Sequence, residues 1–113
     1  MKVSTNNFRV KTYTTINSLQ MQSLLNNNDV IILDVRNPGE FRNGHIPDAI
    51  NIPLNDILGR LAEINSYKNN KVIVYCASGD RSAVASDLLT KNGFKEVYNL
   101  RGGIHSYNGR IVK

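Results

Sequence analysis

Residues 72–82 are Val72-Ile73-Val74-Tyr75-Cys76-Ala77-Ser78-Gly79-Asp80-Arg81-Ser82, a β-branched apolar run that passes into a short polar loop. An unbroken apolar run of this kind is typical of a strand buried on both faces, as in a parallel sheet. After the loop, an apolar stripe with helical spacing continues to a helix end at Asn92-Gly93. The stretch therefore predicts a strand, a loop and a helix in that order, the helix with Val84, Ala85, Leu88 and Leu89 on its apolar side.

The same alternation extends to both sides of this stretch. A second buried-strand pattern, Val30-Ile31-Ile32-Leu33, ends at Asp34, and residues 97–100 form a third, shorter strand. Residues 13–16 indicate another strand, followed by a helix that Asn17 or Ser18 would cap. A further helix is predicted after Pro53, because Leu54, Ile57, Leu58, Leu61 and Ile64 recur at helical spacing.

Strands that alternate with helices predict an α/β protein of three layers, a mostly parallel sheet with helices on both faces. Ligands of such sheets bind at the carboxyl ends of the strands, and Asp34 and Cys76 each lie at such an end. These two residues therefore mark one candidate site. The tail after Asn108-Gly109 is either a short strand at residues 110–112, which could pair with residues 8–12, or a frayed end.

The length of 113 residues fits one domain, and we expect an N-terminal extension at residues 1–12 before a single domain at residues 13–113. Hydrophobic residues make up 41% and charged residues 20%, the balance of a globular rather than a disordered chain. No apolar run approaches the roughly 20 residues that span a bilayer, so no membrane partner is expected. The first residues lack the apolar segment of a secretory signal.

The single cysteine, Cys76, excludes an intramolecular disulfide and cysteine-rich zinc sites, and a free thiol fits a reducing compartment, which predicts a cytoplasmic protein. The histidines, His45 and His105, lack the spacing of metal ligands, so no metal is expected. The net charge of +5 arises in residues 1–28 and 97–113, which contain no Asp or Glu. Because these segments have no dense basic run with interleaved aromatic residues, we expect no nucleic-acid partner.

The loop after Cys76 has the composition of an anion site. A strand-to-helix loop directs backbone N–H groups inward at the positive end of the helix dipole, and the two together bind anions. A thiol placed there is shifted toward the thiolate, and Arg81 adds a fixed charge with paired donors. Gly79 permits unusual backbone angles, and Ser78 and Ser82 offer hydroxyls, with Ser82 also a candidate helix cap. The loop therefore predicts an activated thiolate that faces a bound tetrahedral anion.

Two points weigh against this interpretation. A lone cysteine at a strand end is commonly a small buried apolar residue. In addition, Asp80 lies inside the loop, where an inward carboxylate would raise the pKa of the thiol and repel anions, whereas an outward one would matter little. The sequence leaves that orientation open. The combination of Cys76 with Gly79 and Arg81, between a strand and a helix, favours the reactive thiol.

Four further motifs accompany the loop at residues 76–82: Leu33-Asp34-Val35-Arg36, Glu40-Phe41, Gly44-His45-Ile46-Pro47-Asp48-Ala49-Ile50-Asn51-Ile52-Pro53 and Leu100-Arg101-Gly102-Gly103-Ile104. Together with the loop, they resemble a single-domain rhodanese, a thiosulfate sulfurtransferase-like protein, over about residues 13–108. The resemblance implies a five-stranded parallel sheet flanked by helices. Two positions depart from the usual pattern: Asp48 stands where the family commonly has Gly, and Tyr107 is the nearest aromatic residue where it often has Trp.

The resemblance implies a sulfurtransferase in which Cys76 is the catalytic residue. Its thiolate attacks the outer sulfur of thiosulfate, sulfite leaves, and the resulting persulfide passes its sulfur to cyanide or a small thiol. The loop N–H groups and Arg81 would hold the sulfonate, and no metal or organic cofactor is needed. A protein is an alternative sulfur donor or acceptor. The predicted substrate-binding residues are Ala77, Ser78, Gly79, Asp80, Arg81, Ser82 and Arg36.

Other residues near the loop have structural interpretations. Arg36 could add positive field at the site, but an ion pair with Glu40, four residues on, is the commoner outcome. His45 is expected to make a structural hydrogen bond, because transfer from thiosulfate needs no base. Gly102 and Gly103 fit a tight turn.

Three other functions use related features. The cell-cycle dual-specificity phosphatases share this fold but have a loop one residue longer, because a phosphate monoester needs a larger pocket than a sulfur atom. Here four residues separate Cys76 from Arg81, which is the shorter spacing. An arsenate reductase of the same fold and a non-catalytic persulfide carrier or partner-binding module stay open. The presence of Cys76 argues against an inactive member of the family.

Overall fold

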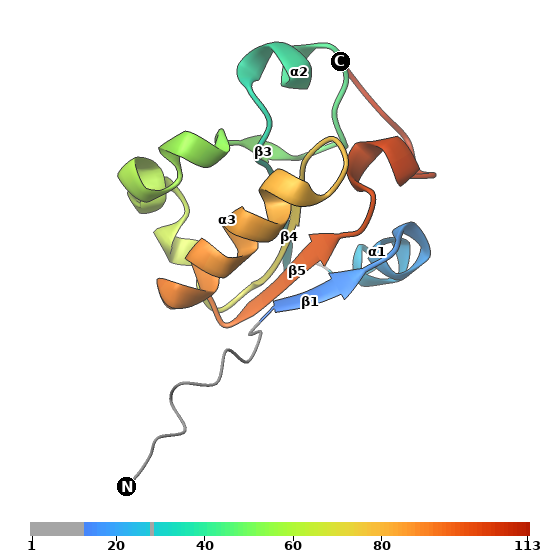
Figure 1. The fold of residues 1–113 in the computed structure, drawn as a ribbon. Coiled ribbons are helices and arrows are strands. Elements are labelled where there is room, and N and C mark those ends of the chain that lie inside the picture. The colour runs from blue at the N-terminus through green and yellow to red at the C-terminus, as the bar shows by residue number, and fades with distance from the viewer. Residues whose placement is uncertain (1–12, 28) are drawn as a thin grey trace, which may run out of the picture.

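The structure is a computed structural model that describes residues 13–27 and 29–113. At its centre lies a five-stranded sheet with the strand order β1-β5-β4-β2-β3, in which each neighbouring pair is parallel (Figure 1). The predicted α/β class and mostly parallel sheet are therefore confirmed. The strands are β1 (Tyr13–Ile16), β2 (Val30–Asp34), β3 (Ile50–Asn51), β4 (Lys71–Tyr75) and β5 (Glu96–Leu100).

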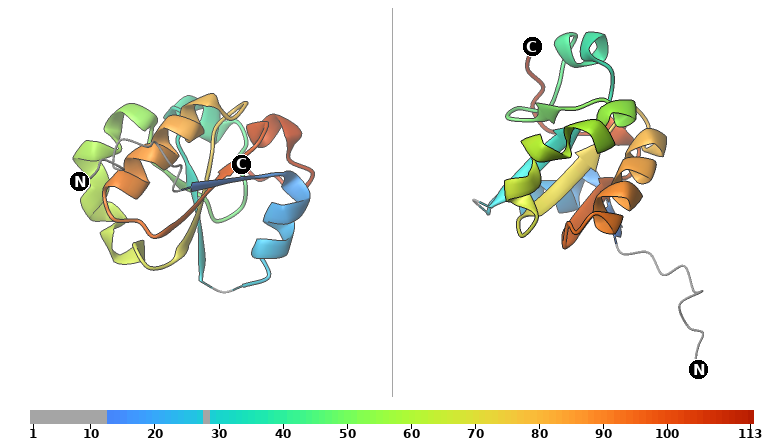
Figure 2. Two further views of the ribbon diagram at one scale, coloured as in Figure 1. Left: turned by 60° about the horizontal axis from the view of Figure 1, so that its bottom comes forward. Right: turned by 90° about the vertical axis from the view of Figure 1, so that its left-hand side faces the viewer.

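Helices cover both faces of the sheet, which confirms the three-layer architecture (Figure 2). One face packs against α3 (Asp80–Lys91) and the 3-10 helices η2 (Leu54–Asp56), η3 (Leu58–Glu63) and η4 (Asn65–Tyr67). The other packs against α1 (Ser18–Leu24) and the segment around η5 (Gly103–Ser106). The short helix α2 (Pro38–Arg42) lies at the carboxyl end of the sheet, beyond β2 (Figure 1).

The central strand β4 divides its side chains between two hydrophobic cores. Val72, Val74 and Cys76 belong to the core beneath α3, whereas Ile73 and Tyr75 belong to the core beneath α1. This is the alternation expected of a strand whose successive side chains point to opposite faces. The cysteine that follows the strand is thereby directed toward the start of α3.

Two predicted helices agree with the structure at their ends. Asn17 caps α1, where its Oδ1 accepts a hydrogen bond of 2.8 Å from the backbone N–H of Gln20. The helix α3 ends at Lys91, one residue before Asn92-Gly93, as predicted. Its buried side differs from the predicted stripe, because Val84 is 53% exposed. The buried positions are Ser82, Ala85, Ser86 and Leu89.

The single helix predicted from Leu54 to Ile64 is wrong. Two 3-10 helices, η2 and η3, occupy this segment, η4 follows it directly, and none of the three has a side-chain cap. The apolar spacing fits the three-residue period of a 3-10 helix about as well as the 3.6-residue period of an α-helix. Gly59 disfavours the α-helix, and Arg60 has non-helical backbone angles (φ −119°, ψ 17°).

The tail pairs with a different partner from the predicted one. Val112 forms an antiparallel bridge with His45, with backbone N–O distances of 2.8 and 2.9 Å. Residues 8–12, the predicted partner, lie outside the described residues, as does the predicted N-terminal extension. Within residues 13–27 and 29–113, no helix combines the length and apolar character needed to cross a membrane.

Candidate active site around Cys76

The candidate site forms where β2 and β4 end side by side. Asp34 pairs with Tyr75 in the β2–β4 register, so Cys76 follows directly beside the end of β2. The chain then turns through residues 77–79 and enters α3 at Asp80, with Gly79 as the N-cap at φ 108°. Cys76 is 1% exposed and lies at the N-terminus of α3, the longest of the described helices. The two predicted strand ends are thus adjacent, but the Asp34 carboxylate lies on the Tyr75 side of the sheet, where it binds Arg36, and does not join Cys76 in one site.

Three hydrogen-bonding groups surround the sulfur. The backbone N–H of Gly79 lies 3.1 Å from Cys76 Sγ, and the backbone N–H and hydroxyl of Ser82 each lie 3.4 Å from it. Burial raises the pKa of Cys76, but the hydrogen bonds from Ser82, Gly79 and Ser78 together outweigh it, and the pKa lies below its ordinary value. The Ser82 hydroxyl and the backbone N–H groups therefore together favour the thiolate, although the residue is buried.

The inward direction of the loop N–H groups has a cause outside the loop. Ile104 N–H donates to Cys76 O at 2.9 Å, and His105 N–H donates to Ala77 O at 3.2 Å. Because a trans peptide points its N–H opposite to its C=O, the N–H groups of Ala77 and Ser78 then face the inside of the loop. The carbonyls of Cys76 and Ala77 are thus turned toward η5, and the opposite, positive side of these peptides faces the inside of the loop.

Gly102 and Gly103 make this contact possible. They have φ values of 75° and 58°, so the predicted tight turn is confirmed. A Cβ atom on Gly103 would lie 2.4 Å from Cys76 O and 2.5 Å from Ala77 C, closer than real atoms approach. Only glycine therefore lets η5 approach the loop backbone this closely.

Arg81 is held by a carboxylate. Its Nη1 and Nη2 lie 2.8 and 3.0 Å from the two oxygens of Glu40 on α2. The hydrogen bonds to Arg81 lower the pKa of Glu40 to about 2, and the same pair raises the pKa of Arg81. Asn37 fixes Glu40 further, because the two residues form a capping box at the start of α2. The predicted anion-binding guanidinium thus already holds a negatively charged group.

Arg36 makes a different ion pair from the predicted one. Its Nη2 lies 2.7 Å from Asp34 Oδ2 and 2.8 Å from Gly44 O, and the Arg36 and Asp34 side chains are 7% and 0% exposed. The predicted pair with Glu40 is wrong, since Glu40 reaches Arg81 instead. Arg36 therefore joins the end of β2 to the loop before β3. Its contact with substrate stays a prediction that this geometry does not favour.

Three further loop residues, Asp80, Ser78 and Ser82, were predicted to bind substrate. Asp80 is exposed, so its carboxylate faces solvent rather than the sulfur. Ser78 is also exposed and acts on the sulfur through its backbone. The proposed helix cap at Ser82 is wrong, because Gly79 is the N-cap and Ser82 lies within the first turn of α3.

The structural interpretation of His45 is confirmed. Its Nδ1 lies 2.8 Å from Phe41 O, and its ring stacks on the Phe41 ring with centroids 3.7 Å apart. These contacts fix the loop that precedes Ile46. Tyr75 holds the same loop from the sheet, because its hydroxyl accepts a hydrogen bond of 3.0 Å from Ile46 N–H.

Sequence reasoning missed one residue beside the sulfur. Asn99 on β5 is 5% exposed, and its Oδ1 accepts a hydrogen bond of 2.5 Å from the Ser82 hydroxyl. The available signal was a polar residue within the apolar pattern of residues 97–100. Such a residue in a buried strand requires a hydrogen-bond partner.

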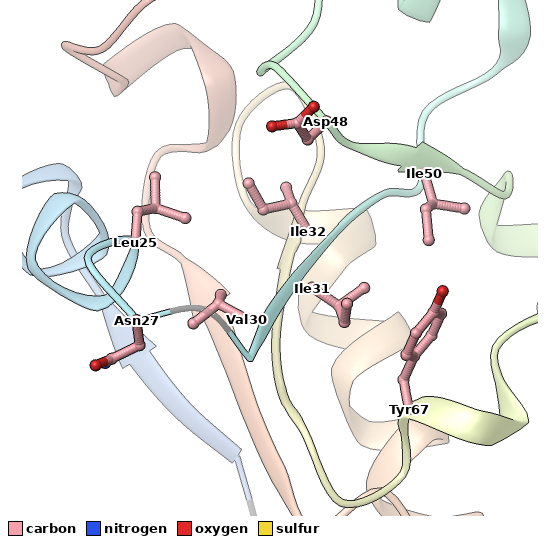
Figure 3. A pocket seen from close by; sticks show the side chains of 8 residues that line it. All are labelled: Leu25, Asn27, Val30, Ile31, Ile32, Asp48, Ile50 and Tyr67. Carbon is pink, nitrogen blue, oxygen red and sulfur yellow. The ribbon is translucent and has the colours of Figure 1, made fainter.

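Two hollows lie near the sheet. A cavity of about 210 Å³ adjoins Arg81 and is lined also by Val35, Asn37, Pro53, Leu54 and Asn55. A larger one of about 500 Å³ lies along β2, between Leu25 and Tyr67, and includes none of residues 76–82 (Figure 3). In the part of the chain that the structure describes, no group of three or more His, Cys, Asp or Glu side chains could hold a metal ion.

The fold and this loop define an α/β protein that directs backbone N–H groups at a thiol at the carboxyl edge of a parallel sheet. The chain belongs to the rhodanese-like domain family, whose model matches residues 18–110. The family resemblance seen in the sequence is therefore confirmed. A solved structure agrees with this assignment: a rhodanese-related protein from Thermoplasma volcanium has a TM-score of 0.78 and 31% identity, over 88% of this chain and 98% of that one.

Relatives in this family carry different names. A sulfurtransferase of Allochromatium vinosum is 43% identical over 83 residues, which covers 74% of this chain and 76% of that protein. A tRNA uridine(34) hydroxylase of Buchnera aphidicola is 36% identical over 98 residues, or 83% of this chain. The chain spans only 31% of the length of that hydroxylase. Domains similar to this chain therefore occur both in a protein named sulfurtransferase and within a longer protein named hydroxylase.

Proposed function

We propose that the protein is a sulfurtransferase in which Cys76 accepts a sulfur atom, carries it as a persulfide and passes it to an acceptor. The observation that carries this proposal is the set of hydrogen bonds between Gly79, Ser82 and a buried sulfur of lowered pKa. The similarity to the sulfurtransferase of Allochromatium vinosum supports it. The spacing of Cys76 and Arg81 supports sulfur rather than a phosphate ester as the transferred group.

The reaction proceeds in two displacements. The Cys76 thiolate attacks the outer sulfur of thiosulfate, a sulfur–sulfur bond forms, and the original bond breaks with its electron pair leaving on sulfite. A thiolate or cyanide then attacks the terminal sulfur of the persulfide, and the electron pair of the breaking bond returns to Cys76. In both steps the loop N–H groups stabilise negative charge on sulfur, without rearrangement of the backbone.

A protein persulfide is a second candidate for the donor, and the Glu40–Arg81 ion pair favours it. A sulfonate must compete with the Glu40 carboxylate for Arg81, whereas a persulfide on another protein brings no sulfonate. In that case the chain works as a persulfide carrier, loading readily from a protein and slowly from thiosulfate.

Intact mass spectrometry tests the proposal. Wild-type protein and a Cys76→Ser variant are treated briefly with thiosulfate or with a small-molecule persulfide, and then with cyanide. We expect the wild type alone to gain the mass of one sulfur atom and to lose it as thiocyanate. If the small-molecule persulfide loads Cys76 and thiosulfate does not, the result would favour a persulfide carrier over a thiosulfate sulfurtransferase. No gain from either donor would overturn the proposal and lead to aryl phosphate and arsenate assays.

A further inference from the structure

Asn99 contacts two of the residues that are hydrogen-bonded to the sulfur. Its Oδ1 lies 2.5 Å from Ser82 Oγ, and its Nδ2 lies 3.5 Å from Gly79 O. Ser82 and Gly79 are in turn hydrogen-bonded to Cys76 Sγ. One side chain of β5 is thereby connected to two of the groups that surround the reactive atom.

The orientation of the Asn99 amide follows from its neighbours. A backbone carbonyl only accepts hydrogen bonds, so the amide must turn its Nδ2 to Gly79 O and its Oδ1 to Ser82. The Ser82 hydroxyl must then donate its single proton to Asn99. Its oxygen is left to accept a hydrogen bond from the Cys76 thiol, 3.4 Å away.

This arrangement suits a thiol and conflicts with a thiolate. After Cys76 loses its proton, the sulfur can only accept, and the best use of the Ser82 hydroxyl is to donate to it. The hydroxyl has one proton and cannot serve Asn99 and the sulfur at once. If it turns to the sulfur, the buried Oδ1 of Asn99 loses its donor.

We propose that Asn99 is a positioning residue that sets the direction of the Ser82 hydroxyl. It holds the Ser82 proton while Cys76 is a thiol and releases it toward the sulfur when the thiolate or the persulfide forms. The proton that leaves Cys76 goes to solvent, and the Asn99 amide takes up none. Only the persulfide part of this inference rests on the proposed function.

Several charged groups lie on the elements packed around Cys76, and the test must leave them unchanged. Arg81 interacts with Cys76 through its charge. Asp80, Arg101 and His105 are exposed, so their side chains face solvent. The groups are Arg81 and the exposed Asp80 from α3, Glu40 from α2, Asp34 and Arg36 from the end of β2, and the exposed Arg101 and His105 from the segment after β5.

A double-mutant cycle tests the inference. Asn99→Leu, which keeps the size of the side chain and removes its polar atoms, is made in the wild type and in a Ser82→Ala background. The pKa of Cys76 is measured from the rate of alkylation by iodoacetamide against pH and from thiolate absorbance. In the wild type, we expect Asn99→Leu to lower the pKa by about one unit, because the hydroxyl then serves the sulfur alone. In the Ser82→Ala background we expect no shift.

The cycle separates this role from simple support of the loop through Gly79 O. Such support would be lost equally in both backgrounds, so equal shifts would overturn the inference, as would a raised pKa in the wild type. If Asn99→Leu does not fold, Asn99→Ala withdraws the same acceptor. Alkylation requires no sulfur transfer, so a failed loading experiment would contradict the proposed function and leave this result to stand on its own.

Discussion

The carboxylate of Glu40 and the guanidinium of Arg81 form a bidentate ion pair, with N–O distances of 2.8 and 3.0 Å. It joins α2 to the first turn of α3 beside the Cys76 loop. The side chains are 32% and 38% exposed, so the pair is accessible to solvent and to small anions. Glu40 therefore occupies the guanidinium donors to which the proposed function assigns the sulfonate of thiosulfate.

Removing the charge of Glu40 should improve the binding of thiosulfate. In Glu40→Gln, the neutral amide competes poorly for Arg81, and we expect the KM for thiosulfate to fall about fivefold, equivalent to about 1 kcal/mol for a partly exposed pair. The kcat should change little. Initial rates of thiocyanate formation against thiosulfate concentration give both constants. A raised KM would show that Glu40 instead holds Arg81 in its productive orientation.

The Glu40–Arg81 ion pair should make the free energy of unfolding depend on pH in the acidic range. Because the pKa of Glu40 falls from 4.5 to about 2 in the folded protein, its contribution is complete above pH 4.5 and is lost as the pH falls toward 2. Since both side chains are about one-third exposed, solvent screening limits this contribution to about 1 kcal/mol. Urea unfolding at about pH 6 and about pH 2.5 measures it. Glu40→Gln should lose less stability between these values, and an equal loss would contradict the prediction.

Replacing Asp48 by glycine should stabilise the fold. Asp48 has φ 68° in an exposed turn, a left-handed conformation that glycine adopts without cost. The gain is partly offset by the greater freedom of glycine in the unfolded chain, which leaves about 0.5 kcal/mol. Asp48→Ala is the matched control and should destabilise, because alanine tolerates this conformation less well than aspartate. The urea midpoints of the three proteins give their order, and an alanine variant above the wild type would refute it.

Asp80 should have no influence on the thiol. The residue is exposed to solvent. The pKa of Cys76 is raised by burial and lowered by hydrogen bonds from Ser82, Gly79 and Ser78. In Asp80→Asn, the rate of alkylation against pH should therefore match that of the wild type. Ser82→Ala provides the contrast, because it removes a hydrogen bond to the thiolate and should raise the pKa. A lowered pKa in Asp80→Asn would mean that the carboxylate turns inward in solution.

The sheet and the loop could be predicted because their signals are local. The unbroken apolar runs before Asp34 and Cys76 gave two neighbouring strands, and the strand–loop–helix order placed the thiol at a helix N-terminus. The 3-10 helices between β3 and β4 could not be predicted in the same way. Their apolar residues satisfy two periodicities, and only the packing of Ile57 and Ile64 against the sheet decides between them.

The partners of the charged and polar side chains were beyond sequence reasoning. Glu40 has Arg36 four residues before it, the usual spacing for an ion pair, yet it pairs with Arg81, 41 positions away. Asn99 reaches Ser82 from a separate strand. Such pairings depend on how α2 and β5 lie against the start of α3, which no local pattern of residues encodes.

Because η5 contacts the backbone of the Cys76 loop, the loop and η5 should differ in how well they tolerate substitutions. The N–H groups of Ala77 and Ser78 have their direction set from behind by Ile104 and His105, which donate to Cys76 O and Ala77 O, and not by the Ala77 and Ser78 side chains. The side chains of Ala77 and Ser78 can therefore vary, and such changes would alter the surface that a sulfur donor or acceptor contacts. Gly103, which contributes no functional group, is the position where even one added methyl would disturb the chemistry.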